Sequence, residues 1–381
     1  EISLGLVGSE MCIRDSSGTV LKDGKAVAKP LHCYSNDSIN HFSIAWNDSL
    51  FMEGWEVKCV SDTRPPFYEI TEVKPLNNAT PHALFIDLGA SASDVWVMND
   101  GYWGIAVTEG QRYNFQFYLF TEELKNTVVT AALLDREDQI VVSKNFQIER
   151  DGSWNHYEGA FTVDTTANDL RFALLLPHKG KVYIDFVSMF PENTFCGHKN
   201  GLREDVAGML RDLRPDFVRW PGGCIVEGLT MDNRIKWKET IGDIVKRPGE
   251  YNLWGYRSTY GFGYHEFLQF CEDIDADGMF VCNAGMSCLF RNGDYWEEEN
   301  RIDNLIQDAL DAIEYALGDT TTVYGKRRAE NGHAAPFPLK YVEVGNENVG
   351  LRYVKNYNRF YKAIKDCLLY TSDAADEEDS V

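Results

Sequence analysis

The residues best suited to chemistry are the adjacent pair Asn346 and Glu347. They follow a stretch, residues 341–345, whose alternating apolar side chains predict a short buried strand that ends at Gly345. In a barrel of parallel strands, catalytic groups lie at that end of a strand. A carboxylic acid there, beside an amide that can hold a hydroxyl group, suits a proton donor to a glycosidic oxygen. An isolated Asn-Glu pair also occurs in solvated loops, so the elements around it decide its meaning.

The elements that would position this pair alternate between helix and strand from Asn200 onward. Helical stripes occupy residues 202–213, 264–271 and 302–316, a fourth begins at Val354, and strands are predicted at 216–220, 279–283 and 341–347. Such alternation predicts parallel strands covered by helices, either a (β/α)₈ barrel or an open sheet. The three strands end in Arg219, Asn283 and Glu347. We therefore expect these side chains at one rim, lining a cleft.

The chain before Asn200 has a different pattern. Between about His82 and Phe190, short alternating runs separated by Gly and Asp turns predict a β-sandwich with no helix. Residues 17–79 show no sustained period and are predicted to be irregular or partly β. Sandwiches of this kind often bind sugars through exposed aromatic side chains, although most such side chains are core. The candidates are Trp96, Tyr102, Trp103, Trp154 and Tyr157.

Composition narrows the classes of partner. The formal charge of −22 over 381 residues argues against nucleic acid or an anionic membrane as partner, because both are polyanions. No apolar run has the length of a membrane-spanning helix. The cysteines show neither a Cys-x-x-Cys pair nor a His at ligand spacing, so the sequence indicates neither a structural zinc nor a disulfide framework.

Both ends of the chain are interpreted as artefacts. Residues 11–16 and 367–372 can be written as codons that are nearly reverse complements, as a sequencing adapter translated at both ends of an insert would be. We therefore expect residues 1–16 and 367–381 to be adapter-derived and the remainder to be a fragment of a longer protein. A natural acidic tail is the alternative for the C-terminal end, which contains Asp373-Ala-Ala-Asp-Glu-Glu-Asp.

Three motifs carry a resemblance to a known family. They are Phe-Val-Arg-Trp-Pro-Gly-Gly-Cys-Ile-Val-Glu-Gly at 217–228, Arg-Ile-Lys-Trp-Lys-Glu-Thr-Ile-Gly at 234–242 and Tyr-Val-Glu-Val-Gly-Asn-Glu-Asn at 341–348. Together they resemble the α-L-arabinofuranosidases of glycoside hydrolase family 51. The resemblance implies a multidomain fold of β plus α/β class. Residues 17–79 would be an irregular N-terminal segment, 80–194 a jelly-roll, galactose-binding-like sandwich resembling a carbohydrate-binding module, and 195–366 the first part of a truncated (β/α)₈ TIM barrel.

The same resemblance implies roles for the residues at the rim. Glu347 would be the acid/base of a retaining hydrolase, and Asn346 would bind the hydroxyl beside the anomeric carbon. Arg219 would lie under the site and hold carboxylates, while Cys224 occupies a position that touches the sugar in some relatives. Asn283, at the end of the middle strand, is a further candidate for substrate binding. No metal and no organic cofactor is expected.

A retaining mechanism needs a second, nucleophilic carboxylate about 5 Å from the first. The resemblance implies that this Glu lies beyond the residues of this chain, and neither Glu227 nor Glu343 is in position to replace it. We therefore expect the chain alone to have little or no activity.

The expected substrate is an arabinose-containing polysaccharide or oligosaccharide, with a secreted or periplasmic location favoured and no prediction of oligomeric state. The alternatives are another barrel glycosidase, such as a xylanase or glucanase, or a non-catalytic carbohydrate-binding protein.

Overall fold

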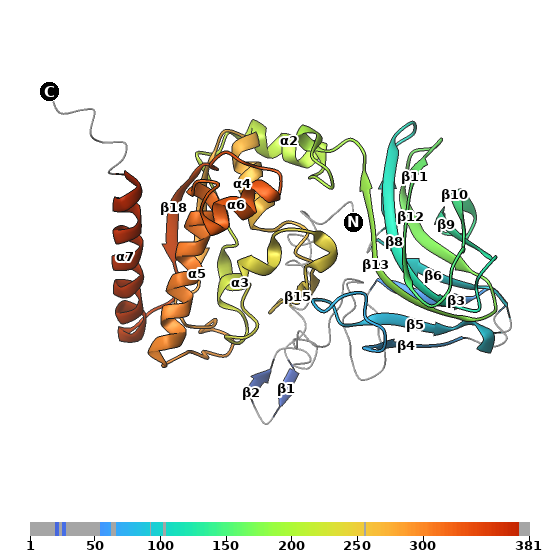
Figure 1. Ribbon diagram of the computed structural model, residues 1–381, viewed down its shortest axis with the longest axis horizontal. Coiled ribbons are helices and arrows are strands. Elements are labelled where there is room, and N and C mark those ends of the chain that lie inside the picture. The colour runs from blue at the N-terminus through green and yellow to red at the C-terminus, as the bar shows by residue number, and fades with distance from the viewer. Residues whose placement is uncertain are drawn as a thin grey trace.

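A computed structural model describes residues 20–22, 25–27, 54–61, 66–91, 93–101, 104–254 and 257–372. Figure 1 shows two parts side by side, one made of antiparallel strands and the other of alternating strands and helices. The strand-rich part is built from β3 to β13, and the mixed part runs from α2 to α7. This agrees with the β plus α/β class that the sequence predicts.

Two antiparallel sheets face each other in the first part. One sheet has the strand order β10-β9-β12-β6-β3, with β7 paired to β12, and the other has the order β11-β8-β13-β5-β4. The strands are β3 (Trp55–Cys59), β4 (Phe67–Thr71), β5 (Ala83–Asp87), β6 (Val95–Asn99), β7 (Ile105–Val107), β8 (Arg112–Glu122), β9 (Val128–Leu134), β10 (Ile140–Gln147), β11 (Trp154–Thr162), β12 (Ala167–Leu176) and β13 (Lys181–Pro191). A short 3₁₀ turn, η4 (Leu88–Ala90), follows β5.

Strand β8 shows why these segments become strands. Its side chains alternate between exposed or half-buried and buried positions, and Tyr113, Phe115, Phe117 and Leu119 point into the space between the sheets. Period-two alternation places every second side chain on one face of a sheet, so the apolar set is buried together. Phe115 stacks on Phe161 with ring centroids 4.3 Å apart. The sandwich core therefore combines aromatic side chains such as these with a larger number of aliphatic ones.

The aromatic candidates for sugar binding are partly buried where the structure describes them. Tyr157 packs against the sandwich core, and Trp96 packs against a smaller cluster around Met98. Trp154 is half-buried, and its indole N–H donates to the carbonyl of Pro75 at 3.2 Å. Tyr102 and Trp103 lie outside the described residues. The three described side chains thus contribute to packing, and sugar binding by this face stays a prediction.

Strands β3 and β4 precede the predicted start of the sandwich at residue 80. β3 pairs with β6, and β4 pairs with β5, so each sheet takes one strand from the segment predicted to be irregular or partly β. Each strand is only five residues long, and Pro65 and Pro66 lie between the two in the sequence. Runs this short carry little periodic signal, which is why pairing partners define them better than sequence does. A hairpin of β1 (Val20–Lys22) and β2 (Lys25–Val27) lies upstream.

The mixed part contains a three-stranded parallel sheet with the order β14-β17-β18. Its strands are β14 (Phe217–Trp220), β17 (Asp277–Cys282) and β18 (Leu339–Val344). Its helices are α2 (Glu204–Asp212), α3 (Gly223–Glu227), α4 (Tyr264–Asp273), α5 (Glu299–Leu317), α6 (Val323–Glu330) and α7 (Leu351–Ser372). Smaller elements are η5 (Phe195–Gly197), η6 (Trp237–Thr240), η7 (Ile244–Lys246), β15 (Glu250–Tyr251) and β16 (Arg257–Ser258). The alternation predicted from Asn200 onward is confirmed for these elements.

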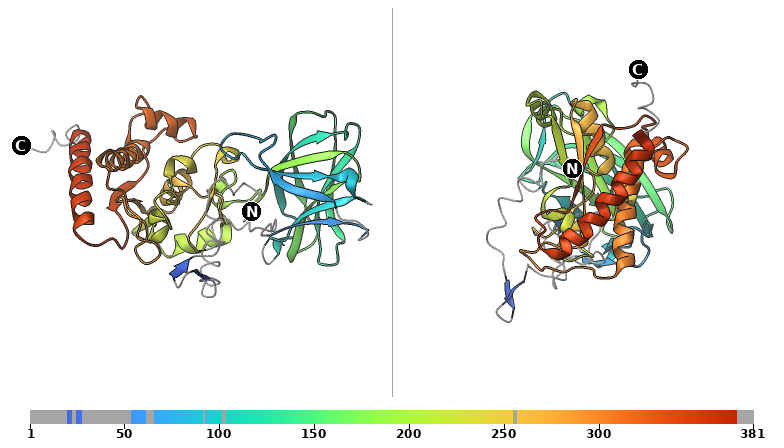
Figure 2. Two further views of the ribbon diagram at one scale, coloured as in Figure 1. Left: turned by 90° about the horizontal axis from the view of Figure 1, so that it is seen from below. Right: turned by 90° about the vertical axis from the view of Figure 1, so that its left-hand side faces the viewer.

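One face of the parallel sheet is covered and the other is open. Trp220 and Phe280 are buried against Tyr264 and Phe267 of α4, in a core that α5 completes. On the opposite face, Phe217 and Tyr341 are 47% and 41% exposed. The open face therefore presents apolar side chains to solvent in the described part of the chain. The helices α5 and α7 lie at the end of the molecule far from the sandwich (Figure 2).

The predicted helical stripes form helices, but two of them are less buried than an apolar stripe implies. On and just after α2, Met209, Leu210 and Leu213 are exposed, and on α7 the exposed residues include Tyr357 and Tyr361. Periodicity predicts a helix, whereas burial also requires a neighbouring element on that face. Helix α7 continues to Ser372, through residues predicted to be adapter-derived, and that origin stays a prediction. Among the described residues, no helix is long and apolar enough to cross a membrane.

His265 in α4 supplies a test of how the second core responds to pH. Its side chain is 8% exposed, one ring nitrogen lies 2.8 Å from the hydroxyl of Tyr315, and its ring meets the ring of Phe337 edge-on. Burial lowers the pKa of this imidazole to about 4. The folded state therefore favours the neutral ring.

This lowered pKa gives a defined loss of stability in acid. The neutral His265 ring contributes about 3 kcal/mol to the free energy of unfolding. This contribution is complete above pH 6.5, the ordinary pKa of histidine, and is lost as pH falls toward 4. We expect urea unfolding to show that the His265→Gln variant loses less stability between pH 7 and pH 5 than the wild type does. The matched control is His156→Gln, an exposed histidine on β11. Equal pH slopes for His265→Gln and wild type would contradict the assignment.

Candidate active site

The candidate site lies at the carboxyl edge of the parallel sheet. Arg219 is the third residue of β14, Asn283 follows β17 directly, and Asn346 and Glu347 follow β18 after one glycine. Parallel strands place their carboxyl ends at one edge, so these residues come together from segments up to 128 positions apart in the chain. The structure thus brings Arg219, Asn346 and Glu347 to one rim, as expected from their strands.

The backbone after β18 turns sharply to present Glu347. Gly345 has φ 78° and Glu347 has φ 48°, a left-handed conformation that is uncommon for a residue with a side chain. The Gly345 amide donates to the carbonyl of Cys282 at 2.7 Å, and the Asn346 amide donates to the side-chain oxygen of Asn348 at 3.2 Å. Glu347 is exposed between Asn346 and Asn348, which are 7% and 8% exposed. The turn therefore buries the two amides and leaves the carboxyl group accessible.

Arg219 ties the two outer strands of the sheet together. Its Nε and Nη2 donate to the two carboxylate oxygens of Glu343 at 2.6 and 2.7 Å, and Nη2 also donates to Oδ1 of Asn346 at 2.9 Å. The Glu343 carboxylate raises the pKa of the guanidinium further above its ordinary value. A two-point pair of this kind fixes orientation as well as distance. Glu343 is therefore paired with Arg219, and the same guanidinium holds the side-chain oxygen of Asn346.

Glu227 holds the two asparagines from the other side. Its carboxylate is 1% exposed and accepts from Nδ2 of Asn348 at 2.8 Å and from Nδ2 of Asn346 at 3.3 Å. Burial raises the pKa of Glu227, and the amide hydrogen bond from Asn346 partly opposes that shift. With Arg219 on its oxygen and Glu227 on its nitrogen, the Asn346 amide has one defined orientation.

Cys224 lies next to Glu347, in the short helix α3 that follows β14. Its thiol donates to Oε2 of Glu347 at 3.7 Å, and burial raises the pKa of this thiol. Because the raised pKa favours the neutral thiol, Cys224 acts here as a weak donor rather than as a nucleophile.

Asn283 is close to this group, but the contacts of its side chain are with backbone. Its Nδ2 donates to the carbonyls of Val226 and Met286 at 2.8 and 3.1 Å, and its Oδ1 accepts from the Gly285 amide at 2.6 Å. The side chain is 7% exposed and joins α3 to the loop after β17. Direct contact between Asn283 and a substrate stays a prediction.

A cavity of about 400 Å³ opens beside the rim. Its lining includes Glu343, Asn346, Glu347, Tyr353 and Tyr357. A larger cavity of about 760 Å³ lies between the sandwich and the mixed part and is lined by residues such as Tyr118, Phe186 and His265. That second cavity contains none of the candidate site residues. The smaller cavity is therefore the one relevant to Glu347, since a reacting carboxyl group must reach its substrate.

Sequence reasoning missed three residues that complete the site. The sequence shows Asn348 only as part of the motif and Glu227 only as an unsuitable nucleophile, and it gives Cys288 no role beyond its place among cysteines without a zinc or disulfide pattern. Cys224 and Glu227 are three positions apart, a spacing that places both on one side of a helical turn. That spacing was a usable signal for Glu227. No local signal connects Cys288, because it reaches the group from the loop after β17.

An acid and an oriented amide at the carboxyl edge of parallel strands are the arrangement that barrel glycoside hydrolases use. Residues 209–372 match the family model described as the alpha-L-arabinofuranosidase 1 domain. The chain is 37% identical over 280 residues to alpha-L-arabinofuranosidase 1 of Arabidopsis thaliana, an alignment covering 73% of this chain and 40% of the relative. It is 35% identical over 294 residues to an extracellular exo-alpha-L-arabinofuranosidase of Streptomyces chartreusis, covering 74% of this chain and 34% of the relative.

A solved structure agrees with these matches. The arabinose-bound MgGH51 α-L-arabinofuranosidase superposes with a TM-score of 0.75 at 25% identity, covering 89% of this chain and 53% of that protein. The chain belongs to glycoside hydrolase family 51, the family of these α-L-arabinofuranosidases. It spans well under half the length of the curated relatives from Arabidopsis and Streptomyces.

The turn that presents Glu347 yields a prediction for Gly345. Its backbone has φ 78°, and a Cβ at this position would overlap Oδ1 of Asn348 and lie 3.1 Å from Cβ of Ala284. We expect Gly345→Ala to destabilise the chain in urea unfolding by clearly more than the roughly 1–2 kcal/mol that a left-handed alanine costs. The matched control is Gly350→Ala, where φ is 92° and nothing lies within 4 Å. Equal losses for the two variants would show that the contact with Asn348 does not matter.

Proposed function

We propose that this chain carries the acid/base part of the active site of a retaining α-L-arabinofuranosidase. The observation that carries the proposal is the exposed Glu347 at the end of β18, beside an Asn346 amide held by Arg219 on one side and by Glu227 on the other. Membership of family 51 supports the choice of an arabinofuranoside as substrate. The relatives named above are themselves α-L-arabinofuranosidases.

Our proposal for the domains follows from the sheets. Residues 80–194, together with β3 and β4, form a jelly-roll, galactose-binding-like module, and residues 195–366 form the first part of a (β/α)₈ barrel. Support comes from the antiparallel pairing of β3 and β4 with the later strands and from the sequential parallel order β14-β17-β18. In such a barrel the catalytic residues lie at the carboxyl edge of the sheet, and Glu347 follows the carboxyl end of β18.

Each residue at the rim then has a role in the reaction. Glu347 donates a proton to the glycosidic oxygen as the bond to the anomeric carbon breaks, and later removes a proton from the attacking water. Asn346 binds the sugar hydroxyl beside the anomeric carbon, because its amide is fixed by Arg219 and Glu227. Cys224 contacts the sugar or the Glu347 carboxyl group from α3. Asn283 is the remaining residue proposed to bind substrate, and its side chain holds the loop after β17 through Gly285 and Met286.

The nucleophile of this mechanism is a second carboxylate about 5 Å from the first. Neither neighbouring glutamate suits that part, because Glu343 is paired with Arg219 and Glu227 is buried under the two asparagine amides. We therefore assign the nucleophile to sequence that this chain does not include. In this assignment, the chain on its own turns over arabinofuranosides far more slowly than a longer protein containing it.

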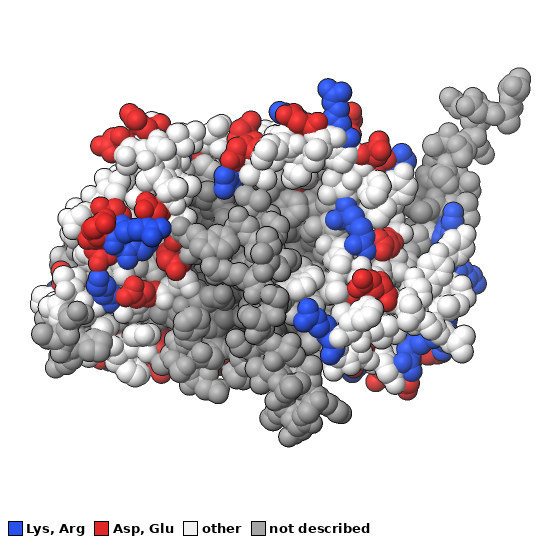
Figure 3. Space-filling model, turned by 180° about the vertical axis from the view of Figure 1, so that it is seen from behind, with Lys and Arg blue, Asp and Glu red and all other residues white. Residues whose placement is uncertain are grey.

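The proposed substrates are arabinose-containing polysaccharides and oligosaccharides of plant origin. The name of the Streptomyces relative, an extracellular exo-acting enzyme, supports action on chain ends outside the cell. Charge gives no reason to invoke nucleic acid, since the formal net charge is −22. Figure 3 shows acidic and basic side chains mixed over the described part of one face, without a large basic patch. Such a surface suits neutral sugar polymers better than polyanions.

The decisive experiment measures hydrolysis of an aryl α-L-arabinofuranoside by a longer protein that contains this sequence. We expect Glu347→Ala to lower kcat by about 100-fold or more on a substrate with a poor leaving group, which is the scale of general acid catalysis. Added azide should restore turnover of an activated substrate, because a small anion can attack the glycosyl intermediate in place of water that needs a base.

The control is Glu330→Ala, which removes a carboxylate at the end of α6 that is 63% exposed. Its activity should match that of the wild type. Unchanged kcat in Glu347→Ala would remove the acid/base assignment. Faster hydrolysis of aryl xylosides or glucosides than of the arabinofuranoside would favour a different barrel glycosidase.

A further inference from the structure

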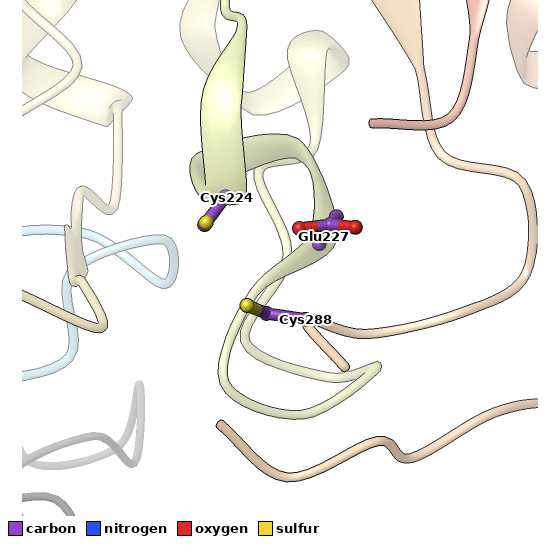
Figure 4. A group of neighbouring side chains, drawn as sticks. All are labelled: Cys224, Glu227 and Cys288. Atoms are coloured by element: carbon purple, nitrogen blue, oxygen red, sulfur yellow. The ribbon is translucent and has the colours of Figure 1, made fainter. Parts of the chain in front are cut away.

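Two thiols and a carboxylate converge behind the acid/base candidate. One ligand atom each from Cys224, Glu227 and Cys288 lies within 4.8 Å of the other two. Figure 4 shows Cys224 and Glu227 on the turn of α3 that follows β14, with Cys288 reaching the same place from a separate segment below. Glu227 and Cys288 are each 1% exposed, and Cys224 is half-buried. The group is thus enclosed, with its opening on the side of Cys224.

The types and spacing of these atoms fit one class of ligand. In a tetrahedral zinc site with bonds of about 2.3 Å to sulfur and 2.0 Å to oxygen, neighbouring ligand atoms are about 3.5–3.8 Å apart. The ligand atoms of the observed group lie within 4.8 Å of one another, so they must approach by at most about 1.3 Å to reach that spacing. Thiolate ligands select zinc and other soft cations over magnesium and calcium, which prefer oxygen.

We infer that Cys224, Cys288 and Glu227 form a binding site for Zn²⁺ whose fourth position faces Glu347. Oε2 of Glu347 is 3.7 Å from Sγ of Cys224. Glu347 is not among the three residues whose ligand atoms lie within 4.8 Å of one another, so its side chain must move toward Glu227 and Cys288 to reach the metal. Binding breaks the two S–H bonds, releases both protons to solvent, and forms two Zn–S bonds and one Zn–O bond. The Glu347 carboxylate or a water molecule completes the coordination.

The surrounding contacts hold the three ligands in place. Each oxygen of Glu227 accepts one amide hydrogen, from Asn348 and from Asn346, and keeps a lone pair for a metal. The Cys288 amide donates to the carbonyl of Gly228 at 3.1 Å, and the carbonyl of Cys288 accepts from three backbone amides that follow it. Hydrogen-bonded partners of this kind orient ligands and raise metal affinity.

A metal at this position has a consequence for the reaction, and this consequence alone rests on the proposed function. Zinc bound to Glu347 removes the group that donates the proton, so the metal-bound state would be inactive. Zinc binding itself involves no substrate and no turnover. A failure of the glycosidase proposal therefore leaves the metal site testable, and the reverse also holds.

The first test uses Co²⁺ as a spectroscopic substitute for Zn²⁺ on the reduced chain. We expect an intense sulfur-to-metal charge-transfer band in the near ultraviolet and visible bands of tetrahedral cobalt, both bleached by one equivalent of Zn²⁺. The wild-type chain alone decides this test, so it does not depend on whether a variant folds. A spectrum that shows the weak bands of octahedral cobalt and no charge-transfer band would overturn the proposal.

The second test compares Cys288→Ser with Cys196→Ser by calorimetric titration with Zn²⁺. Cys288 takes no part in the proposed reaction, and Cys196 is an exposed cysteine in η5, outside the group. Loss of the Cys288 thiolate should weaken binding by more than about 100-fold, since partners outside the ligand set are already worth 10–100-fold. Cys196→Ser should bind as the wild type does. Equal affinity in Cys288→Ser, with an unchanged circular dichroism spectrum, would overturn the site.

A third variant, Glu347→Gln, addresses the fourth position. Weaker Zn²⁺ binding with the charge-transfer band of cobalt retained would confirm that Glu347 is a ligand. Unchanged affinity would overturn the contact between the metal and Glu347, and with it the inactive state.

Discussion

The arrangement at the rim depends on the reach of one side chain, Arg219. It lies on β14 and bonds to Glu343 on β18, with β17 between them. Adjacent strands are about 4.8 Å apart, so the pair spans roughly 10 Å across the sheet. The same guanidinium bonds to Asn346 and so sets the direction of the residue before Glu347. A lysine lacks the planar fork needed to make all these bonds at once, which makes the position specific for arginine.

Much of this arrangement was predictable from the sequence, because it rests on periodic signals. The strands ending near Trp220, Cys282 and Val344 are short alternating or apolar runs followed by glycine or polar residues, and parallel pairing brings their ends together. The sequence therefore predicts that Arg219, Asn283 and Glu347 lie at one rim, with Asn346 next to Glu347. The helices between the strands were predictable for the same reason, since their apolar spacing is long and regular.

Other features depend on contacts that leave no local pattern. Strands β3 and β4 are only five residues long, and their partners lie far along the chain. Cys288 joins Cys224 and Glu227 through a loop whose path is set by backbone hydrogen bonds to residues such as Gly228. Apolar periodicity also overstated the burial of Leu213, because a stripe identifies a helix without naming the element that covers it. These are tertiary contacts. A single sequence contains the residues that make them but no pattern that shows which residues meet.

The fixed orientation of Asn346 has a consequence for selectivity. Its oxygen accepts one hydrogen bond from Arg219, and its nitrogen donates one to Glu227. One lone pair of the oxygen and one N–H of the nitrogen therefore remain side by side for a ligand. A hydroxyl group, which can give one hydrogen bond and take another, satisfies both. An ether, a fluorine or a methylene in the same place would leave the remaining donor or acceptor of Asn346 without a hydrogen-bond partner in a partly desolvated pocket. Under the role proposed for Asn346, the amide itself would discriminate against methylated or deoxygenated sugars, independently of the shape of the cavity.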